Sequence, residues 1–171
     1  MRVTPRCKYF GLCGGCSLQH LDARAQVAAK QRVLEDTLWH IGKVKPEEIL
    51  PAIYGVPWGY RRRARLTARY VAKKGGVLVG FREKRGSYVA DMTSCEVLPP
   101  HISALLVPMR EVLSRLSIRE RMPQVEVALG DALDVLVLRN LLPLSADDEA
   151  LLREFADRHA VQLYLQPRGP D

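Results

Sequence analysis

Apolar and polar residues alternate along segment 61–72, and this pattern predicts a β-strand. Odd positions carry mostly arginine, and even positions after the start carry apolar side chains. The apolar positions are Ala64, Leu66, Ala68, Tyr70 and Ala72. A period of two indicates one buried and one solvated face. Lys73–Gly76 then predicts a turn, and Val77–Phe81 and Tyr88–Ala90 are predicted to return as strands of a meander.

A first helix is predicted over residues 22–41. Asp22 is a suitable N-cap, long side chains and alanines fill the body, and Gly42 follows the end. The apolar positions expected on its buried face are Val27, Leu34, Leu38 and Ile41.

Two further segments have helical spacing. Apolar residues recur at intervals of three and four from Ile102 to Leu116, and Pro108 should kink or delay this helix. Ser145 followed by Asp148 resembles a capping box that opens another helix. Its expected buried residues are Leu151, Leu152, Phe155 and His159.

Three more strands complete the expected fold. Val125–Leu129 and Leu133–Arg139 flank a Gly130-Asp131 turn, and Val161–Leu165 alternates near the end of the chain. Together, these elements predict an α+β fold: an antiparallel sheet with helices packed on one face.

Length and composition restrict the class of protein. The chain has 171 residues, 47% of them hydrophobic, which is ample for one packed core. Its first residues contain no secretory signal, and no apolar run approaches membrane-spanning length. We therefore expect a cytoplasmic protein with no membrane partner, in which cysteines stay reduced.

Positive charge is concentrated in one segment. The net charge is +7, and residues 61–85 hold ten basic side chains against Glu83 alone. Arginine binds phosphate oxygens in pairs and stacks on exposed bases. With Trp58 and Tyr60 just upstream, the segment predicts a surface for single-stranded or looped RNA. The alternative is a solvated sheet edge that repels other strands. The candidate RNA-binding residues are Arg61, Arg62, Arg63 and Arg65.

Four cysteines are the clearest candidates for site chemistry. Cys7, Cys13 and Cys16 are spaced C-x5-C-x2-C, and Cys95 stands alone. Three thiolates from one loop and a remote fourth are a common ligand set for a [4Fe-4S] cluster, so the N-terminal loop is predicted to be an iron-sulfur loop. Zinc is the alternative, although only Cys13 and Cys16 form the usual knuckle. Gly14 and Gly15 can adopt positive φ and carry no side chain, so the backbone can wrap the cluster and point N–H groups at its sulfurs.

The motifs also carry a family resemblance. CKYFGLCGGCSLQH (7–20), PWGYRRRAR (57–65), Cys95 and the closing LYLQPRGPD (163–171) resemble the iron-sulfur-containing RNA (uracil-C5)-methyltransferases of bacteria, in particular the 23S rRNA branch. Members of this family typically combine an OB-like domain, a central cluster-bearing domain and a Rossmann-like domain that binds S-adenosylmethionine. The resemblance implies that the cluster ligands are Cys7, Cys13, Cys16 and Cys95, and that the basic strand faces 23S rRNA.

The resemblance also implies which part of such an enzyme this chain represents. Residues 1–21 are expected to form the cluster loop, closed by Cys95, and residues 22–171 the central RNA-binding domain. The family's chemistry needs a free cysteine nucleophile and a glycine-rich cofactor turn, and the chain offers neither. We therefore expect the catalytic domain, with its S-adenosylmethionine, to be absent and this chain alone to be inactive. The alternative is a stand-alone iron-sulfur redox or sensing module that docks an acidic partner.

Overall fold

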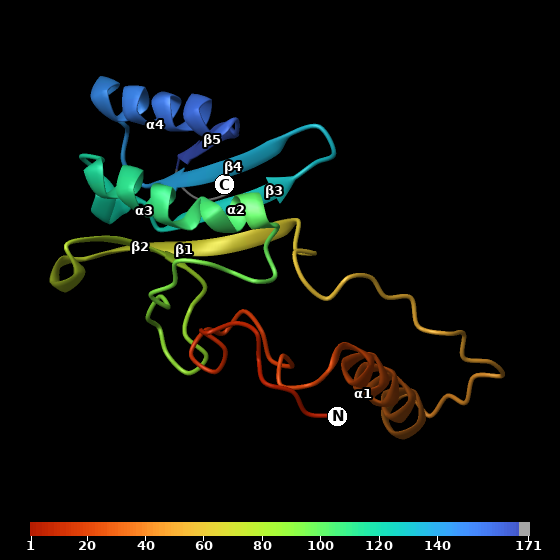
Figure 1. Cartoon of the computed structure of the whole chain (residues 1–171). Helices are drawn as coiled ribbons and strands as arrows, with labels where there is room; N and C mark the ends of the chain where they lie inside the picture. Colours follow the sequence, from red (N-terminus) through yellow and green to blue (C-terminus); the bar gives the residue numbers. More distant parts are fainter. Residues whose placement is uncertain (168–171) are drawn as a thin grey trace.

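One mixed sheet forms the centre of the molecule. The computed structural model describes residues 1–167, so the last four residues of the closing LYLQPRGPD run, 168–171, lie outside the described residues. Five strands follow the order β2-β1-β3-β4-β5 (Figure 1). They are β1 (Arg63–Val71), β2 (Gly76–Gly80), β3 (Gln124–Leu129), β4 (Asp134–Asn140) and β5 (Gln162–Pro167). The predicted α+β class is confirmed.

The alternation predicted for the basic strand is present in β1. Leu66 and Ala68 are buried, whereas Arg63, Arg65 and Arg69 are exposed. The side chains of a strand alternate between the two faces of its sheet, so the sequence pattern correctly separates the core face of β1 from its solvated face.

The prediction of a purely antiparallel sheet is wrong at one edge. β1 pairs antiparallel with β2 and β3, and β3 pairs antiparallel with β4, but β4 and β5 run parallel, with Leu136 opposite Leu163. Helix α4 (Ala146–His159) joins these two strands. Because the helix carries the chain back past the sheet, β5 enters in the same direction as β4.

The predicted third strand of the meander, Tyr88–Ala90, is also wrong as a strand. It is reduced to one isolated bridge between Arg82 and Val89, so β2 stays the edge strand of the sheet. After Phe81 the chain turns aside to bond to the N-terminal loop, where the Lys84 N–H donates to Leu12 at 2.7 Å. Those backbone groups are therefore not available to extend the sheet.

The helices on the sheet largely match the expectation. A helical segment predicted from Ile102 to Leu116 is split at Leu105, because Pro108 has no N–H to donate to the carbonyl of Ala104. Within residues 1–167, no helix is long and apolar enough to cross a membrane. The helical elements, besides α4, are α1 (Ala23–Asp36), the π-helical turn η1 (Thr37–Ile41), α2 (Pro100–Ala104), α3 (Leu106–Arg115) and the 3₁₀ turns η2 (Ala72–Lys74) and η3 (Arg119–Arg121).

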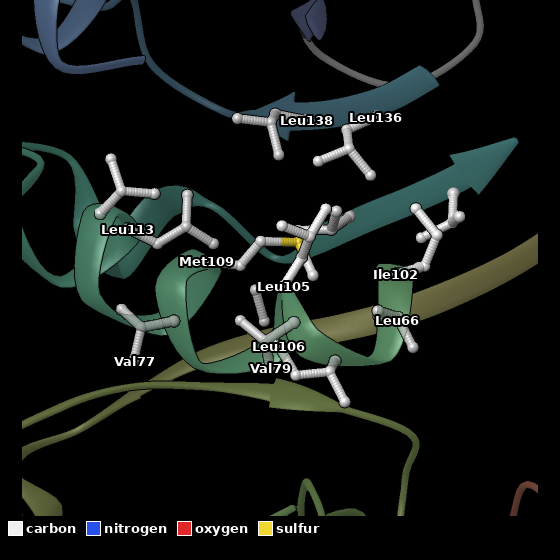
Figure 2. Packing of buried hydrophobic residues seen from close by; sticks show 14 of the residues in the cluster. Leu66, Val77, Val79, Ile102, Leu105, Leu106, Met109, Leu113, Leu136 and Leu138 are labelled. Atoms are coloured by element: carbon white, nitrogen blue, oxygen red, sulfur yellow. The ribbon is translucent and has the colours of Figure 1, made fainter. Parts of the chain in front are cut away.

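A single hydrophobic cluster joins α2, α3 and α4 to one face of the sheet. Figure 2 shows Leu66, Leu136 and Leu138 from the strands facing Leu106 and Met109 of the helix. All of these side chains are almost fully buried. Helices α2, α3 and α4 therefore pack on the same face, as predicted.

The burial predicted for the first helix is wrong. Asp22 caps α1 as expected, accepting from the Ala25 N–H at 3.0 Å. However, no residue of α1 is buried, and of its apolar positions Leu34 is 53% exposed. Figure 1 shows the reason: α1 lies apart from the sheet, so no other element covers its apolar stripe.

The predicted capping box of α4 is present, and its Asp148 side chain makes additional hydrogen bonds outside the box. Asp148 accepts from the backbone N–H of Ser145 at 3.1 Å, and the Ser145 hydroxyl accepts from the Asp148 N–H. The same carboxylate also accepts from the N–H and hydroxyl of Ser117, beyond the end of α3. Burial raises the pKa of Asp148, but these hydrogen bonds outweigh it and hold the pKa below its usual value.

Replacing Asp148 with asparagine should therefore destabilise the fold by about 1–3 kcal/mol at neutral pH, because an amide NH₂ would face backbone N–H donors. The pKa of Asp148 is lower in the folded state, so the carboxylate stabilises fully above the unfolded-state pKa of about 3.9 and loses this effect as the pH falls through the folded-state pKa. Urea unfolding from roughly pH 6 to pH 3 should show the variant losing less stability than the unaltered chain. The exposed neighbour Asp147→Asn is the control; an equal loss there would contradict the role of Asp148.

Candidate metal centre and nucleic-acid interface

The N-terminal cysteine loop is anchored to the chain that follows β2. Cys13 forms an isolated bridge with Glu83, and the Gly14 N–H donates to the Arg82 carbonyl at 2.8 Å. Cys13 is buried, whereas Cys7 and Cys16 are partly exposed. These bonds fix the loop backbone, and with it the positions of the three thiols.

The two glycines of the loop are needed for space rather than for positive φ. Among residues 1–167 the glycines with positive φ are Gly11, Gly59 and Gly75, so Gly14 and Gly15 do not use this conformation. A Cβ at Gly14 would lie 2.9 Å from the Arg82 carbonyl oxygen, and one at Gly15 would lie 2.9 Å from the Phe81 ring. A side chain at either position would separate the loop from its support.

The segment around Cys95 is joined to the same loop. The hydroxyls of Tyr9 and Thr93 share a hydrogen bond of 2.9 Å, and the Arg6 guanidinium forms an ion pair with Glu96 at 2.7 Å. Cys95 itself is buried, and its N–H donates to the Ser103 hydroxyl at 2.8 Å. The fourth cysteine is thus brought to the other three from a distant part of the sequence.

The other cysteines lie close enough to Cys13 and Cys95 to affect these two thiols electrostatically. Burial raises the pKa of Cys13, and the charges of Cys95, Cys16 and Cys7 raise it further. Burial likewise raises the pKa of Cys95, with additional contributions from Cys16 and Cys7. The structure therefore gathers the four sequence-predicted metal residues.

Backbone N–H groups point toward these sulfurs. The Gly15 N–H donates to Cys13 Sγ at 3.4 Å, and hydrogen bonds from the backbone of Leu98 and Val97 lower the pKa of Cys95 against the effect of burial. Donors aimed at sulfur stabilise the thiolate form, which is the form that binds metal.

However, the four thiols are not placed to coordinate a single metal ion. Within residues 1–167, no group of three or more His, Cys, Asp or Glu side chains is arranged to hold a metal ion. A single zinc ion needs all its sulfur ligands about 2.3 Å from one centre. In a cubane cluster each cysteine binds a different iron, so the thiols stand farther apart.

The four predicted RNA-binding arginines have different environments. Arg61 precedes β1 and turns toward the cysteine loop, donating to the Gly15 carbonyl at 3.2 Å with its guanidinium 5.3 Å from the centre of the Phe81 ring. Arg62 forms an ion pair with Asp131 at 3.0 Å, in the turn between β3 and β4. Only Arg63 and Arg65 belong to the exposed row on β1.

Arg65 is partly neutralised by the neighbouring strand, because its Nε lies 3.0 Å from a carboxylate oxygen of Glu126 on β3. Its side chain is still 72% exposed and can reach a further anion. Arg63 is also exposed. This pair is therefore the part of the predicted surface that most clearly faces solvent.

Sequence reasoning missed the residues that close the cysteine loop. Arg6 lies over the Trp58 ring at 5.4 Å and pairs with Glu96, while Tyr9 bonds to Thr93. No periodicity or motif connects residues this far apart in the chain. Their position beside Cys7 and Cys95 was the only available signal.

Comparison with known proteins finds relatives that match the whole length of this chain. No protein-family model matches the sequence. The 23S rRNA (uracil(1939)-C(5))-methyltransferase RlmD of Ralstonia pickettii is 68% identical over 170 residues, covering 99% of this chain and 38% of that protein. The proteins of the same name from Nitrosospira multiformis and Burkholderia cenocepacia are 68% and 67% identical, with 38% and 37% of their lengths covered. The chain thus spans little more than a third of these relatives. At this identity along its whole length, the chain is similar to the matching portion of these 23S rRNA (uracil-C5)-methyltransferases, in agreement with the resemblance carried by its cysteine and arginine motifs.

Proposed function

We propose that this chain is the part of a 23S rRNA (uracil-C5)-methyltransferase that binds an iron-sulfur cluster and positions RNA. The observation that carries the proposal is the convergence of Cys7, Cys13, Cys16 and Cys95: burial raises the pKa of Cys13 and of Cys95, and the charges of Cys7 and Cys16 raise both further. In the proposed organisation, residues 1–21 form the cluster loop, closed by Cys95, and the remaining residues to 171 form the RNA-binding domain.

The donor set fits a [4Fe-4S] cluster. Four reduced thiols are present, N–H groups point at two of the sulfurs, and the spacing does not suit a single ion. Soft thiolate ligands favour iron-sulfur clusters and zinc over hard cations. The cluster would add covalent links between the N-terminal loop and the Cys95 segment, which otherwise depend on a few polar contacts. Its proposed role is structural.

Methyl transfer from S-adenosylmethionine to a uracil C5 is assigned to sequence outside these residues. The relatives are much longer, and their name describes methylation of a uracil in 23S rRNA. All four cysteines here are committed to the cluster, so the chain has no thiol left to attack the uracil ring. This portion is instead proposed to hold RNA against the catalytic part.

The exposed arginines of β1 provide the test of RNA positioning. Reversing Arg63 and Arg65 to glutamate should weaken the binding of a 23S rRNA stem-loop tenfold or more, and it should lower the slope of log affinity against log salt by about 1.4 for two lost phosphate contacts. Fluorescence anisotropy over a salt series measures both quantities.

A matched reversal of Arg153 and Arg158, which are exposed on α4 on the helical side of the sheet, is the control. It changes the net charge equally but should leave the affinity nearly unchanged. If both double variants lose the same affinity, binding follows net charge alone and the proposed β1 surface is excluded.

A further inference from the structure

Along β1, β3, β4 and β5 one face of the sheet is not buried by any described element, whereas at the β2 edge Leu78, opposite Arg69 on this face, is buried. On β1, β3, β4 and β5, every second side chain points away from the helices, and none of these residues is buried, whereas the positions between them include buried Leu66, Val127 and Leu136. Figure 1 shows α2, α3 and α4 on the opposite side. We call this the open face. Its residues are Arg63, Arg65, Thr67, Arg69, Gln124, Glu126, Ala128, Val135, Val137, Arg139, Gln162, Tyr164 and Gln166.

The strand register arranges the open face in rows that cross the sheet. One row runs from Arg65 through Glu126 and Val137 to Tyr164. Neighbouring strands are about 4.8 Å apart, so Arg65 and Tyr164 are separated by roughly 14 Å at the backbone. That distance suits a short stretch of nucleotides lying across the strands.

The charges of the open face favour an anionic partner. Four arginines (Arg63, Arg65, Arg69 and Arg139) stand against one acidic residue, Glu126. The Nε of Arg139 is itself buried, so Arg63, Arg65 and Arg69 are the arginines of this face that are exposed to a partner. This excess of positive charge is unlike the apolar centre of a protein–protein interface.

The far edge of the open face offers a stacking group. Tyr164 on β5 is 55% exposed, and its hydroxyl is 3.4 Å from the side-chain oxygen of Gln162. Val137 lies beside it in the same row. Unpaired bases stack on aromatic rings displayed by an open sheet, and amide side chains can hydrogen-bond to base edges. Bases within a duplex are already stacked on one another and cannot lie flat on this ring.

We propose that the open face is a platform for single-stranded RNA, on which Tyr164 stacks a base while Arg63, Arg65 and Arg69 hold phosphates. The platform rests on the proposed function of positioning RNA. It adds a path for the strand, from β1 across the sheet to β5, and a base-contacting residue that the basic sequence motif does not contain.

The test compares Tyr164→Ala with Tyr164→Phe in the 171-residue chain. A short fluorescein-labelled oligouridine and an RNA duplex of the same length serve as probes in anisotropy titrations. Loss of one stacked base should weaken oligouridine binding by roughly fivefold to a hundredfold in Tyr164→Ala, whereas Tyr164→Phe should stay within about twofold. Binding of the duplex should be weaker and unaffected by either change.

Photocrosslinking locates the contact independently of the variants. Oligonucleotides carrying 5-iodouridine should crosslink to the peptide that contains Tyr164. Equal affinity of Tyr164→Ala and the unaltered chain, or crosslinks confined to other peptides, would overturn the platform. The proposed function survives that result if the Arg63/Arg65 reversal still weakens binding.

Two further outcomes are decisive. Equal losses in Tyr164→Ala and Tyr164→Phe would implicate the hydroxyl and reject stacking. If the unaltered chain binds neither RNA probe nor the 23S rRNA stem-loop, the platform and the proposed RNA function fail together. A change of oligomeric state in Tyr164→Ala with unchanged oligouridine binding would assign the open face to protein contacts instead.

Discussion

Anaerobically reconstituted Cys95→Ser is expected to retain less than about a tenth of the iron bound by the unaltered chain, because loss of a direct ligand should cost at least as much as loss of a residue that only orients one. Serine is a harder, less acidic ligand than cysteine and leaves one iron without its thiolate. Iron and sulfide analysis, with the visible absorbance of the cluster, measures the loss.

The same variant should also free the N-terminal loop. Metal binding contributes directly to folding when a segment has little core of its own, so residues 1–21 should lose protection from hydrogen exchange while the central sheet keeps it. Ser94→Ala, a change at the neighbouring residue, is the control.

Unchanged protection in Cys95→Ser would contradict a structural role for the cluster. In that case the Arg6–Glu96 ion pair and the Tyr9–Thr93 hydrogen bond would be sufficient to hold the loop. Exposed pairs of this kind typically contribute less than about 1 kcal/mol each, so we expect them to be insufficient.

Leu66→Ala should produce the largest loss of stability outside the cysteine centre. Leu66 has no exposed surface and lies on β1 between the helices and the sheet (Figure 2). Removing its side chain should cost about 2–5 kcal/mol, because transfer energy is lost and the surrounding core collapses only partly into the cavity. Guanidinium unfolding of the anaerobic chain measures the change.

Leu34→Ala on α1 is the matched control, since the same side chain is removed from an exposed position. We expect a change within about 0.5 kcal/mol there. Comparable losses for Leu66→Ala and Leu34→Ala would contradict the burial difference between β1 and α1.

Features encoded over a few residues were predictable. The alternation along β1, the break before Pro108 and the capping box at Ser145 each depend on neighbours within about one helical turn or one strand. The amphipathic pattern of α1 likewise predicts the helix itself. It cannot specify what covers the apolar stripe, because that depends on elements distant in sequence.

The candidate site also has some features that could be predicted from the sequence and others that could not. Thiol chemistry and spacing were enough to select the four cysteines, and the basic alternation was enough to find Arg63 and Arg65. The turn of Arg61 toward Gly15 and the separation of Arg62 from the row were not predictable, because both follow from contacts made by other loops.

By itself, the sequence determined the helices and most strands, the family resemblance, and which residues are candidates to bind a metal cluster. These follow from local backbone preferences and from side-chain chemistry, and both are independent of the tertiary structure. Only the tertiary structure decided that β5 runs parallel, that Cys95 meets the N-terminal loop, and that Tyr164 shares an open face with the arginines of β1. Strand direction and long-range contacts depend on how the connecting segments return the chain to the core. The sequence of a short segment does not specify the course of those connections.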